Sequence, residues 1–322
     1  MKALLVSELG PDFAGCGLAE MPDPVRTPGQ ALIRVRAASL NFPDLLMTEG
    51  RYQLKPDLPF VPGMEVAGEV LDADRDSAFA PGEAVVAGTR LGGFAELVAV
   101  DERSVRPLPA NLDFAAGASV GAAYNTAYVS LVRRANVQPG EWVLVHGATG
   151  GVGLAAVDLA KALGARVIAT SRSPDKLATM AADYKVEATL PAPGFREAVK
   201  EITGGGADVI VDPVGGDVFD ESTRCIAFGG RLLVIGFTSG RIASVATNIP
   251  LIKGFAVIGV RAGEYGRRFP DKGRETQDAI WALATEGRIR PRVDRRYALA
   301  DWRTAFEAMR DSRMIGKIVI EP

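Results

Sequence analysis

The sequence is poor in the residues from which metal centres and nucleophilic sites are most often built. Its 322 residues include a single histidine, His146, and two cysteines, Cys16 and Cys225. A metal site with several imidazole ligands is therefore excluded, and so is a serine–histidine–aspartate system without His146. Two cysteines alone form neither a disulfide framework nor a zinc cluster. Because His146 ends a predicted strand just before a glycine-rich turn, we expect it to be a packed structural residue.

The sequence also lacks long hydrophobic runs and an excess of one charge. No stretch approaches the roughly 18 apolar residues that span a bilayer, and the first residues, MKALLVSELGPD, hold too short an apolar run for a signal peptide. The 37 Lys and Arg residues nearly balance the 39 Asp and Glu residues, so no overall field attracts nucleic acid. The basic segment Arg267–Arg274 is either a solvated face or a contact for an anionic substrate tail. We expect a cytoplasmic protein that binds neither membranes nor nucleic acid.

The pattern of apolar residues predicts an α/β protein with two domains. The first third holds short strand-like runs separated by Pro-Gly turns, which is typical of a β-rich domain. From residue 142 onward apolar strands alternate with helical stretches, which predicts βαβ units and a doubly wound parallel sheet. The strands predicted in this part are 142–147, 166–171, 208–213, 231–236 and 255–260. The predicted helices are 115–135, 152–163, 174–182, 195–202 and 217–228, with two more between 276 and 309 before a closing strand in 316–322.

The most specific motif is VLVHGATGGVG (143–153), in which a strand runs through a glycine turn into a helix. In this context Gly147 would allow the tight turn, and Gly153 would let the helix pack closely on the sheet. Between them the backbone can approach a pyrophosphate, which the N–H groups of the first helical turn would bind. The motif therefore predicts a dinucleotide site rather than a purely structural turn. The cofactor-binding residues predicted from it are Gly147, Ala148, Thr149, Gly150, Gly151, Val152 and Gly153.

The end of the next strand indicates which dinucleotide binds. An acidic residue there would bind the ribose 2′-hydroxyl of NAD, whereas an arginine accommodates a 2′-phosphate. This strand ends in Ser171 and Arg172, and Lys176 follows one helical turn later. A hydroxyl and two cations suit a phosphate dianion, so we predict NADPH as the cofactor. Ser173 and Pro174 also suit the start of a solvated helix, and both interpretations can hold together.

Several longer motifs, taken in order, resemble the quinone oxidoreductase (zeta-crystallin-like) family of the medium-chain dehydrogenase/reductase superfamily. They are SLNFPDLLMTEGRY (39–52), LPFVPGMEVAGEV (58–70), NTAY (125–128), QPGEWVLVHGATGGVG (138–153), DPVGGDVFD (212–220), GGRLLVIGF (229–237) and GKIVIEP (316–322). The resemblance implies a GroES-like catalytic domain made of residues 1–116 and 259–322, with a Rossmann domain at 117–258. It also implies a homodimer formed by edge strands of the Rossmann sheets, for which residues 255–260 are the candidate.

The resemblance also bears on metal binding, because many members of the superfamily are zinc alcohol dehydrogenases. Their catalytic ligand positions fall here on Asn41, Met64 and Ala122, which offer zinc no useful ligand. The four-cysteine structural zinc lobe is missing as well, so a metal-free reductase is implied. Without a Lewis acid the substrate must accept hydride through conjugation, as a quinone or an α,β-unsaturated carbonyl does. The protein then positions the reactants and places donors near the carbonyl oxygen.

Two catalytic residues are implied by the resemblance, Asn41 and Tyr52. Asn41 would donate a hydrogen bond through its amide near the nicotinamide and also contact the cofactor. Tyr52 would donate a hydrogen bond or a proton, although solvent can supply the proton instead. From the residues alone, Asn41 is equally a turn residue before Pro43, and Tyr52 a packed aromatic.

Further cofactor contacts are implied at Thr126, Gly236, Phe237 and Lys317. Lys317 equally fits a solvated lysine at a strand edge. Family members commonly have a tyrosine near the 2′-phosphate; here Leu190 falls near that position and Tyr184 is a substitute for it.

Two rival functions stay open at this point. One is an enoyl-thioester reductase of the acryloyl- or crotonyl-CoA type, for which the segment Arg267–Arg274 would contact a phosphorylated carrier. The other is a non-catalytic protein that binds NADPH as a structural or sensing ligand.

Overall fold

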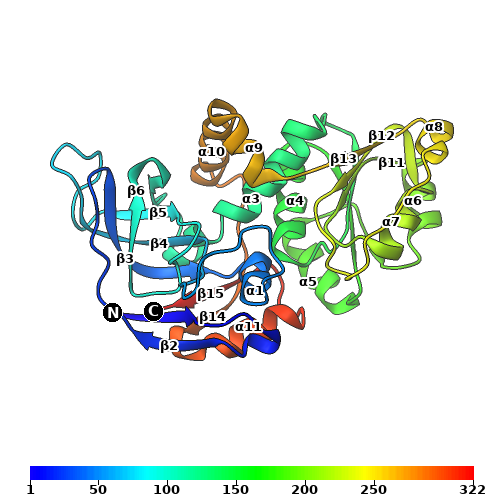
Figure 1. Ribbon diagram of the computed structural model, residues 1–322. Coiled ribbons are helices and arrows are strands. Elements are labelled where there is room, and N and C mark those ends of the chain that lie inside the picture. Colours follow the sequence, from blue (N-terminus) through cyan, green and yellow to red (C-terminus); the bar gives the residue numbers. More distant parts are fainter. The chain divides into compact units, whose positions relative to one another are not determined.

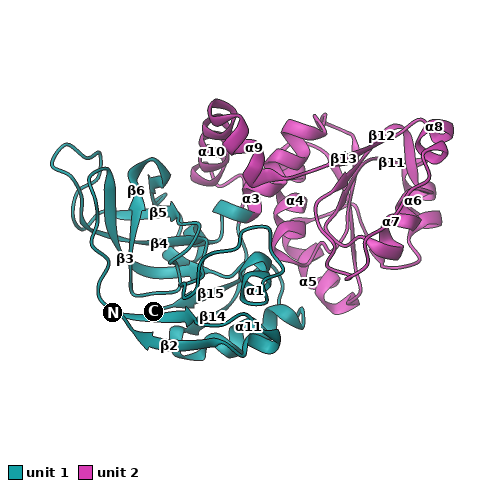
Figure 2. Cartoon of the chain, viewed as in Figure 1, with its two compact units in different colours: residues 1–122, 291–322 teal, residues 123–290 magenta.

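The chain forms two compact units, which Figure 2 distinguishes by colour. The computed structural model describes all residues, 1–322. Unit 1 contains residues 1–122 and 291–322, and unit 2 contains residues 123–290. The chain thus leaves unit 1, forms unit 2 and returns to unit 1, so that both termini belong to unit 1 (Figure 1).

Unit 1 is built on short strands with few helices. Its strands are β1 (Lys2–Val6), β2 (Cys16–Glu20), β3 (Gln30–Ser39), β4 (Glu65–Asp72), β5 (Ala84–Gly88), β6 (Leu97–Asp101), β7 (Val105–Pro107), β14 (Val293–Ala298) and β15 (Lys317–Glu321). Its helices are α1 (Phe42–Thr48), α2 (Phe114–Ala118) and α11 (Trp302–Arg310), with short 3₁₀ turns η1 (Pro11–Phe13), η2 (Glu102–Ser104) and η4 (Leu299–Asp301).

The main sheet of unit 1 joins the two ends of the chain. Its order is β14-β15-β3-β4-β5-β7, with β6 also paired to β3. Strand β15 runs antiparallel to β3, with Val319 opposite Ser39 and Ile320 opposite Ala38. Because of this pairing, Lys317 at the start of β15 comes close to the end of β3.

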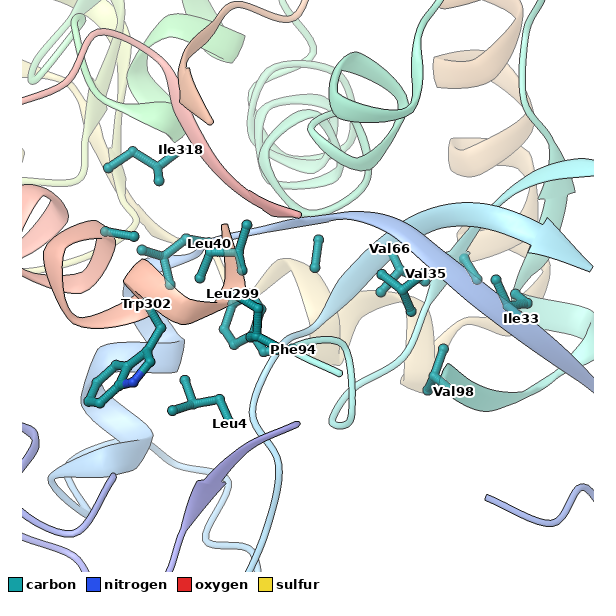
Figure 3. Packing of buried hydrophobic residues seen from close by; sticks show 14 of the residues in the cluster. Leu4, Ile33, Val35, Leu40, Val66, Phe94, Val98, Leu299, Trp302 and Ile318 are labelled. Carbon is teal, nitrogen blue, oxygen red and sulfur yellow. The ribbon is translucent and has the colours of Figure 1, made fainter. Parts of the chain in front are cut away.

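An aromatic cluster forms part of the core of unit 1. Helix α11 buries Trp302 and Phe306, which lie one turn apart and therefore share one face. Phe306 packs edge-on against Phe13, Phe94 and Trp302, with ring centroids 5.3, 5.8 and 5.6 Å away. Figure 3 shows Trp302, Leu299 and Ile318 of the C-terminal segment in the same cluster as Leu4, Leu40 and Phe94 of the N-terminal part. The return segment is therefore an integral part of this core.

Unit 2 alternates strands with helices. Its strands are β8 (Trp142–Val145), β9 (Arg166–Ser171), β10 (Ala188–Pro191), β11 (Ala207–Asp212), β12 (Ile226–Val234) and β13 (Ala256–Gly259). Its helices are α4 (Gly151–Ala162), α5 (Pro174–Tyr184), α6 (Arg196–Thr203), α7 (Gly216–Ser222), α8 (Asn248–Lys253), α9 (Ala262–Arg268) and α10 (Pro270–Thr285). Helix α3 (Gly121–Tyr128) begins in unit 1, and the π-helical turn η3 (Val129–Arg134) continues it in unit 2.

The sheet of unit 2 is parallel throughout, in the order β10-β9-β8-β11-β12-β13. This is the doubly wound Rossmann order: from β8 the chain adds strands toward one edge of the sheet, and from β11 toward the other edge. Such folds bind ligands beside this switch point between β8 and β11, at the carboxyl ends of the strands. The predicted fold class, a GroES-like β-rich part with a Rossmann part, is confirmed. No helix is long and apolar enough to cross a bilayer.

Several predicted elements differ from the observed ones. The helix predicted at 217–228 ends at Ser222, and Ile226 already begins β12 because it pairs with Ala207 of β11. Strand β10 was not predicted, since its four residues include Pro191. The helix predicted at 115–135 is divided into α2, α3 and η3.

The predicted return to the catalytic part at residue 259 comes earlier than the return of the chain to unit 1. Helices α9 and α10 still belong to unit 2. Arg133 of η3 reaches Thr276 at 3.1 Å and pairs with Glu275 at 3.0 Å. These contacts hold α10 in unit 2, which ends at Arg290.

Candidate functional site

The glycine turn of unit 2 brings the start of α4 close to the end of β8. A Cβ on Gly153 would lie 2.2 Å from the carbonyl oxygen of Gly147, so only glycine fits there. Gly147 has a φ of +56°, which glycine adopts readily. The N–H of Leu154 bonds to the carbonyl of Gly150 at 2.8 Å. The N–H groups before Leu154 in the first turn therefore lack a helical acceptor and suit an anion.

The end of β9 lies beside this turn. The N–H of Ala148 bonds to the carbonyl of Thr170 at 3.0 Å, and the hydroxyls of Thr149 and Ser171 are 3.2 Å apart. Arg172 follows Ser171, is exposed and makes no ion pair. The structure thus brings together the two parts of the predicted dinucleotide site.

The residues around Arg172 are arranged as the start of a helix. The hydroxyl of Ser173 accepts the N–H of Lys176 at 3.4 Å, with Pro174 in the first turn of α5. The hydroxyl of Tyr184 donates to the carbonyl of Arg290 at 2.7 Å, and Leu190 pairs with Thr170 in β10. Neither of these two residues offers a free donor for a third phosphate contact.

The loops after β11 and β12 meet at the same edge of the sheet. The N–H of Thr238 bonds to the carbonyl of Pro213 at 3.1 Å, and a Cβ on Gly215 would lie 3.1 Å from the ring of Phe237. A Cβ on Gly236 would lie 3.2 Å from that same Pro213 carbonyl oxygen. Phe237 is 45% exposed. Gly236 and Phe237 therefore lie at the carboxyl edge of the sheet in unit 2, and their contact with the cofactor stays a prediction.

Asp212, which sequence reasoning did not select, organises the loop after β11. Its Oδ1 accepts the N–H groups of Val214 and Gly215 at 2.8 and 2.9 Å, while its buried Oδ2 has no hydrogen-bond partner. Burial raises the pKa of this carboxyl. In the sequence, the string DPVGG (212–216) that begins with Asp212 was the signal that could have identified this residue.

Thr126 lies on α3, just before the π-helical turn η3. The hydroxyl of Ser130 donates to the carbonyl of Thr126 at 2.6 Å. The prediction that Thr126 contacts the cofactor stays a prediction.

His146 is a buried structural residue, as expected. Its ring nitrogens lie 2.8 Å from the hydroxyls of Thr170 and Ser222, and its ring packs 4.7 Å from that of Phe195. Burial lowers the pKa of His146 to about 3, so the imidazole is neutral at physiological pH.

In unit 1, Asn41 lies in a buried polar cluster with Glu65 and Lys317. Lys317 Nζ donates to Asn41 Oδ1 at 2.6 Å and to Glu65 Oε1 at 3.1 Å. The amide Nδ2 of Asn41 donates to Glu65 Oε1 at 2.9 Å and to the carbonyl of Ser39 at 3.1 Å. The alternative of a solvated Lys317 is wrong, because this residue is 4% exposed.

These contacts correct the expected donor role of Asn41, because both of its amide hydrogens already have acceptors. Asn41 also precedes α1, where the Asp44 carboxylate accepts its main-chain N–H at 2.8 Å. The second oxygen of Asp44 accepts the N–H of Gly63 at 3.1 Å. Burial raises the pKa of Asp44 to about 7.

Tyr52 is half-buried and packs beside an apolar cluster of Val6, Met47 and Phe60. Its hydroxyl makes no hydrogen bond within the chain. Tyr52 is thus a packed aromatic with an available donor, which combines both interpretations of this residue.

The positions that correspond to zinc ligands are used in other ways. The N–H of Ala122 donates to Glu65 Oε2 at 2.6 Å, and Met64 packs beside the same apolar cluster as Tyr52. No group of three or more His, Cys, Asp and Glu residues that could hold a metal ion occurs in the chain.

Each cation of the basic segment forms an ion pair with a nearby acid. Arg267 and Arg268 both pair with Glu264 at 2.9 Å. Lys272 pairs with Glu275 at 3.0 Å, and Arg274 pairs with Asp271. The segment therefore fits a solvated face.

Comparison with known proteins agrees with the fold. Residues 27–110 match the alcohol dehydrogenase GroES-like domain, and residues 151–277 match the family described as zinc-binding dehydrogenase. A GroES-like part combined with a Rossmann part defines the medium-chain dehydrogenase/reductase class.

Individual relatives narrow this class. A quinone oxidoreductase-like protein 2 homolog of Nematostella vectensis is 36% identical over 304 residues, which cover 90% of this chain and 81% of that protein. A structure of a probable oxidoreductase from Mycobacterium abscessus is 38% identical, with a TM-score of 0.91 and coverage of 100% of this chain and 99% of that one. The quinone oxidoreductase of Thermus thermophilus, solved also as its complex with NADPH, is 32% identical with a TM-score of 0.85 and 100% coverage of both chains. The chain belongs to the quinone oxidoreductase-like family of oxidoreductases.

Proposed function

We propose that the protein is an NADPH-dependent, metal-free reductase of quinones or α,β-unsaturated carbonyls. The observation that carries this proposal is the junction of the glycine turn with Ser171 and Arg172 at the end of β9. The hydroxyls of Thr149 and Ser171 join the glycine turn to the end of β9, and Arg172, which makes no ion pair, follows Ser171 where an acid would be expected for NAD. The solved NADPH complex of the Thermus relative supports the same choice.

Unit 2 would hold the cofactor along this junction. The first turn of α4 would bind the pyrophosphate through its N–H groups, and Arg172 would pair with the 2′-phosphate. Lys176, Thr126, Gly236 and Phe237 would complete the contacts. When bound, NADPH supplies a hydride from C4 of its nicotinamide ring.

Unit 1 would supply polar groups for the substrate. A conjugated acceptor gains negative charge on its carbonyl oxygen as the hydride arrives, and then a proton. The hydroxyl of Tyr52 has no hydrogen-bond partner in the chain. We assign it as the donor to that oxygen. Asn41, held by Lys317 and Glu65, is assigned to ligand binding.

We further propose that two copies associate through β13, the outer strand of the parallel sheet. Apolar side chains are exposed there and on the neighbouring elements: Val257 is 38%, Phe228 89% and Leu251 81% exposed. Sedimentation should give twice the chain mass of 34.0 kDa. Val257→Lys should weaken the dimer, whereas Val25→Lys, at a position 89% exposed in unit 1, should not. A monomeric wild type would contradict this arrangement. The two free cysteines suit the reducing cytoplasm.

The function is tested by NADPH oxidation with matched quinones, enones and enoyl thioesters under one set of conditions. Quinones or enones should be reduced with the highest kcat/KM, and simple alcohols should not be oxidised. Highest efficiency with enoyl thioesters would favour that rival instead. NADPH binding without turnover of any acceptor would indicate a non-catalytic role.

A further inference from the structure

Lys317 and Glu65 form an ion pair in the interior of unit 1. Lys317 Nζ lies 3.1 Å from Glu65 Oε1, and each side chain is 5% exposed. Removing both charges from water offsets much of their attraction, so such a pair is weak evidence for added stability. What the pair does achieve is to fix its neighbours.

The neighbour most constrained is the side chain of Asn41. An ammonium only donates hydrogen bonds and a carboxylate only accepts them. Lys317 therefore requires the amide oxygen of Asn41 at 2.6 Å, and Glu65 requires the amide nitrogen at 2.9 Å. A flipped amide would set its oxygen against the Glu65 carboxylate and its hydrogens against the ammonium. Only one orientation is compatible with this pair.

Glu65 itself is held from a second direction. Its Oε2 accepts the N–H of Ala122 at 2.6 Å, within the first turn of α3. A Cβ on Gly121 would lie 2.7 Å from the same oxygen, so glycine leaves room for the carboxylate. The carboxylate therefore cannot turn away from Asn41 without giving up the bond to the helix.

We propose that Lys317 and Glu65 are positioning residues that make Asn41 a hydrogen-bond acceptor toward its ligand. Both amide hydrogens of Asn41 are used within unit 1, and the N–H of Asp44 bonds to the main-chain carbonyl of Asn41 at 2.9 Å. The amide oxygen accepts from Lys317 through one lone pair, so its second lone pair is what Asn41 can still offer. Its ligand partner is then a hydroxyl or N–H group, such as a ribose hydroxyl or the carboxamide of a nicotinamide nucleotide. The substrate carbonyl is not its partner. This inference rests on the proposed function and refines it.

A double-mutant cycle tests whether Lys317 acts through Asn41. Lys317→Met and Asn41→Ala should each lower the affinity for NADPH about tenfold in a fluorescence titration, as expected for one lost hydrogen bond. The double variant should weaken it no further than Asn41→Ala alone. Lys161→Met is the matched control, since Lys161 forms a more exposed pair with Glu187 at 2.6 Å. Additive losses, or an equal loss in the control, would contradict the proposal.

Two further variants keep the test decisive if Lys317→Met does not fold. Lys317→Arg keeps the charge and should stay within about threefold of wild-type NADPH affinity, well short of the tenfold loss. Combining Glu65→Gln with Lys317→Met removes both charges and should still lose NADPH affinity about tenfold. Wild-type affinity in this neutral double variant would overturn the role of the pair.

A readout without cofactor separates this inference from the proposed function. The side-chain amide resonances of Asn41, identified in ¹⁵N-labelled protein by their loss in Asn41→Ala, should shift in Glu65→Gln. Unshifted resonances would contradict the orientation. A shift in a protein that binds no NADPH would support the orientation and overturn the proposed function.

Discussion

Each unit buries one basic side chain, and the two are handled in opposite ways. In unit 1, Lys317 is ion-paired with Glu65 and bonded to Asn41. In unit 2, His146 sits between the hydroxyls of Thr170 and Ser222, and burial keeps it neutral by lowering its pKa. Arg172, the cation of unit 2 that we propose for cofactor binding, is exposed.

The difference between the buried Lys317 and the exposed Arg172 distinguishes a residue that positions its neighbours from one that can bind a ligand. A buried charge whose partner is also buried is already neutralised, so its main effect is to fix the geometry of its neighbours. An exposed cation beside a helix N-terminus has no internal partner and can gain one from an anionic ligand. Unit 1 therefore holds its polar groups in a set geometry, while in unit 2 the positive charge of Arg172 is available to an anionic ligand.

The largest expected effect concerns the charge in unit 1. Lys317→Met leaves the Glu65 carboxylate buried without its counter-charge, which should lower the free energy of unfolding by about 3–5 kcal/mol. Lys161→Met breaks a pair whose side chains are 28% and 31% exposed and should cost about 0–1 kcal/mol. Urea denaturation of both variants measures the two losses. Similar losses would show that the two pairs are equivalent and would contradict this expectation.

A smaller loss of stability is expected when a side chain is added to the glycine turn of unit 2. In Gly153→Ala the new Cβ would meet the Gly147 carbonyl at 2.2 Å and push α4 from β8. We expect a loss of about 1–3 kcal/mol in stability, as for other overpacked sites, together with weak NADPH binding. At Gly88, which lies in β5 outside the proposed site, a Cβ would meet nothing within 4 Å, so Gly88→Ala is the control. Equal NADPH affinities in these two variants would show that the close approach is not required.

Buried groups in the two units should respond oppositely to acid. His146 has a pKa of about 3 when folded and 6.5 when unfolded, so the unfolded state binds more protons between these values. Its contribution to stability therefore falls as the pH falls below 6.5, by about 2 kcal/mol at pH 5. Asp44 has a pKa raised from 3.8 to about 7, so its folded state binds more protons between these values. Its contribution rises as the pH falls through 7, by a similar amount.

Neutral variants isolate these two contributions. Going from pH 7.5 to pH 5, the destabilisation caused by His146→Gln should shrink by about 2 kcal/mol, whereas that caused by Asp44→Asn should grow. Denaturation of both variants and the wild type at the two pH values provides the measurement. The same pH dependence in all three proteins would contradict the assignment.

The smallest expected effect is that of metal removal. Asn41, Met64 and Ala122 offer zinc no adequate ligands, and the cation near Asn41 is the Lys317 ammonium. Chelators should therefore leave turnover unchanged, and elemental analysis should find no stoichiometric zinc. One tightly bound zinc ion per chain would contradict this expectation.

Much of unit 2 could be predicted from sequence because its signals are local. Continuous apolar strands, the glycine turn and the residues after β9 lie within short windows of the chain. Ile226 was assigned to a helix because local pattern cannot show pairing with Ala207 of the neighbouring strand. Strand β10 was missed because it is short and ends in Pro191.

The polar cluster of unit 1 could not be predicted in this way. Glu65 and Lys317 are 252 residues apart in the chain, and only the pairing of β15 with β3 brings them together. Because the sequence does not show the buried partners of Lys317, a cofactor contact and a solvated strand-edge lysine fit it equally well. For the same reason the sequence predicts Asn41 to be a donor. Its donor capacity depends on neighbours that only the folded structure reveals.

The most direct test of NADPH selection by unit 2 is the ratio of kcat/KM for NADPH to that for NADH, measured in the wild type and in Arg172→Ala. A charge-assisted bond to the 2′-phosphate is worth about 1.5–3 kcal/mol, which corresponds to roughly a tenfold to hundredfold preference. We expect a wild-type preference for NADPH of this size, and we expect Arg172→Ala to lose most of it because NADPH binding alone becomes weaker. A wild-type ratio near one, or a variant that weakens both cofactors equally, would contradict it.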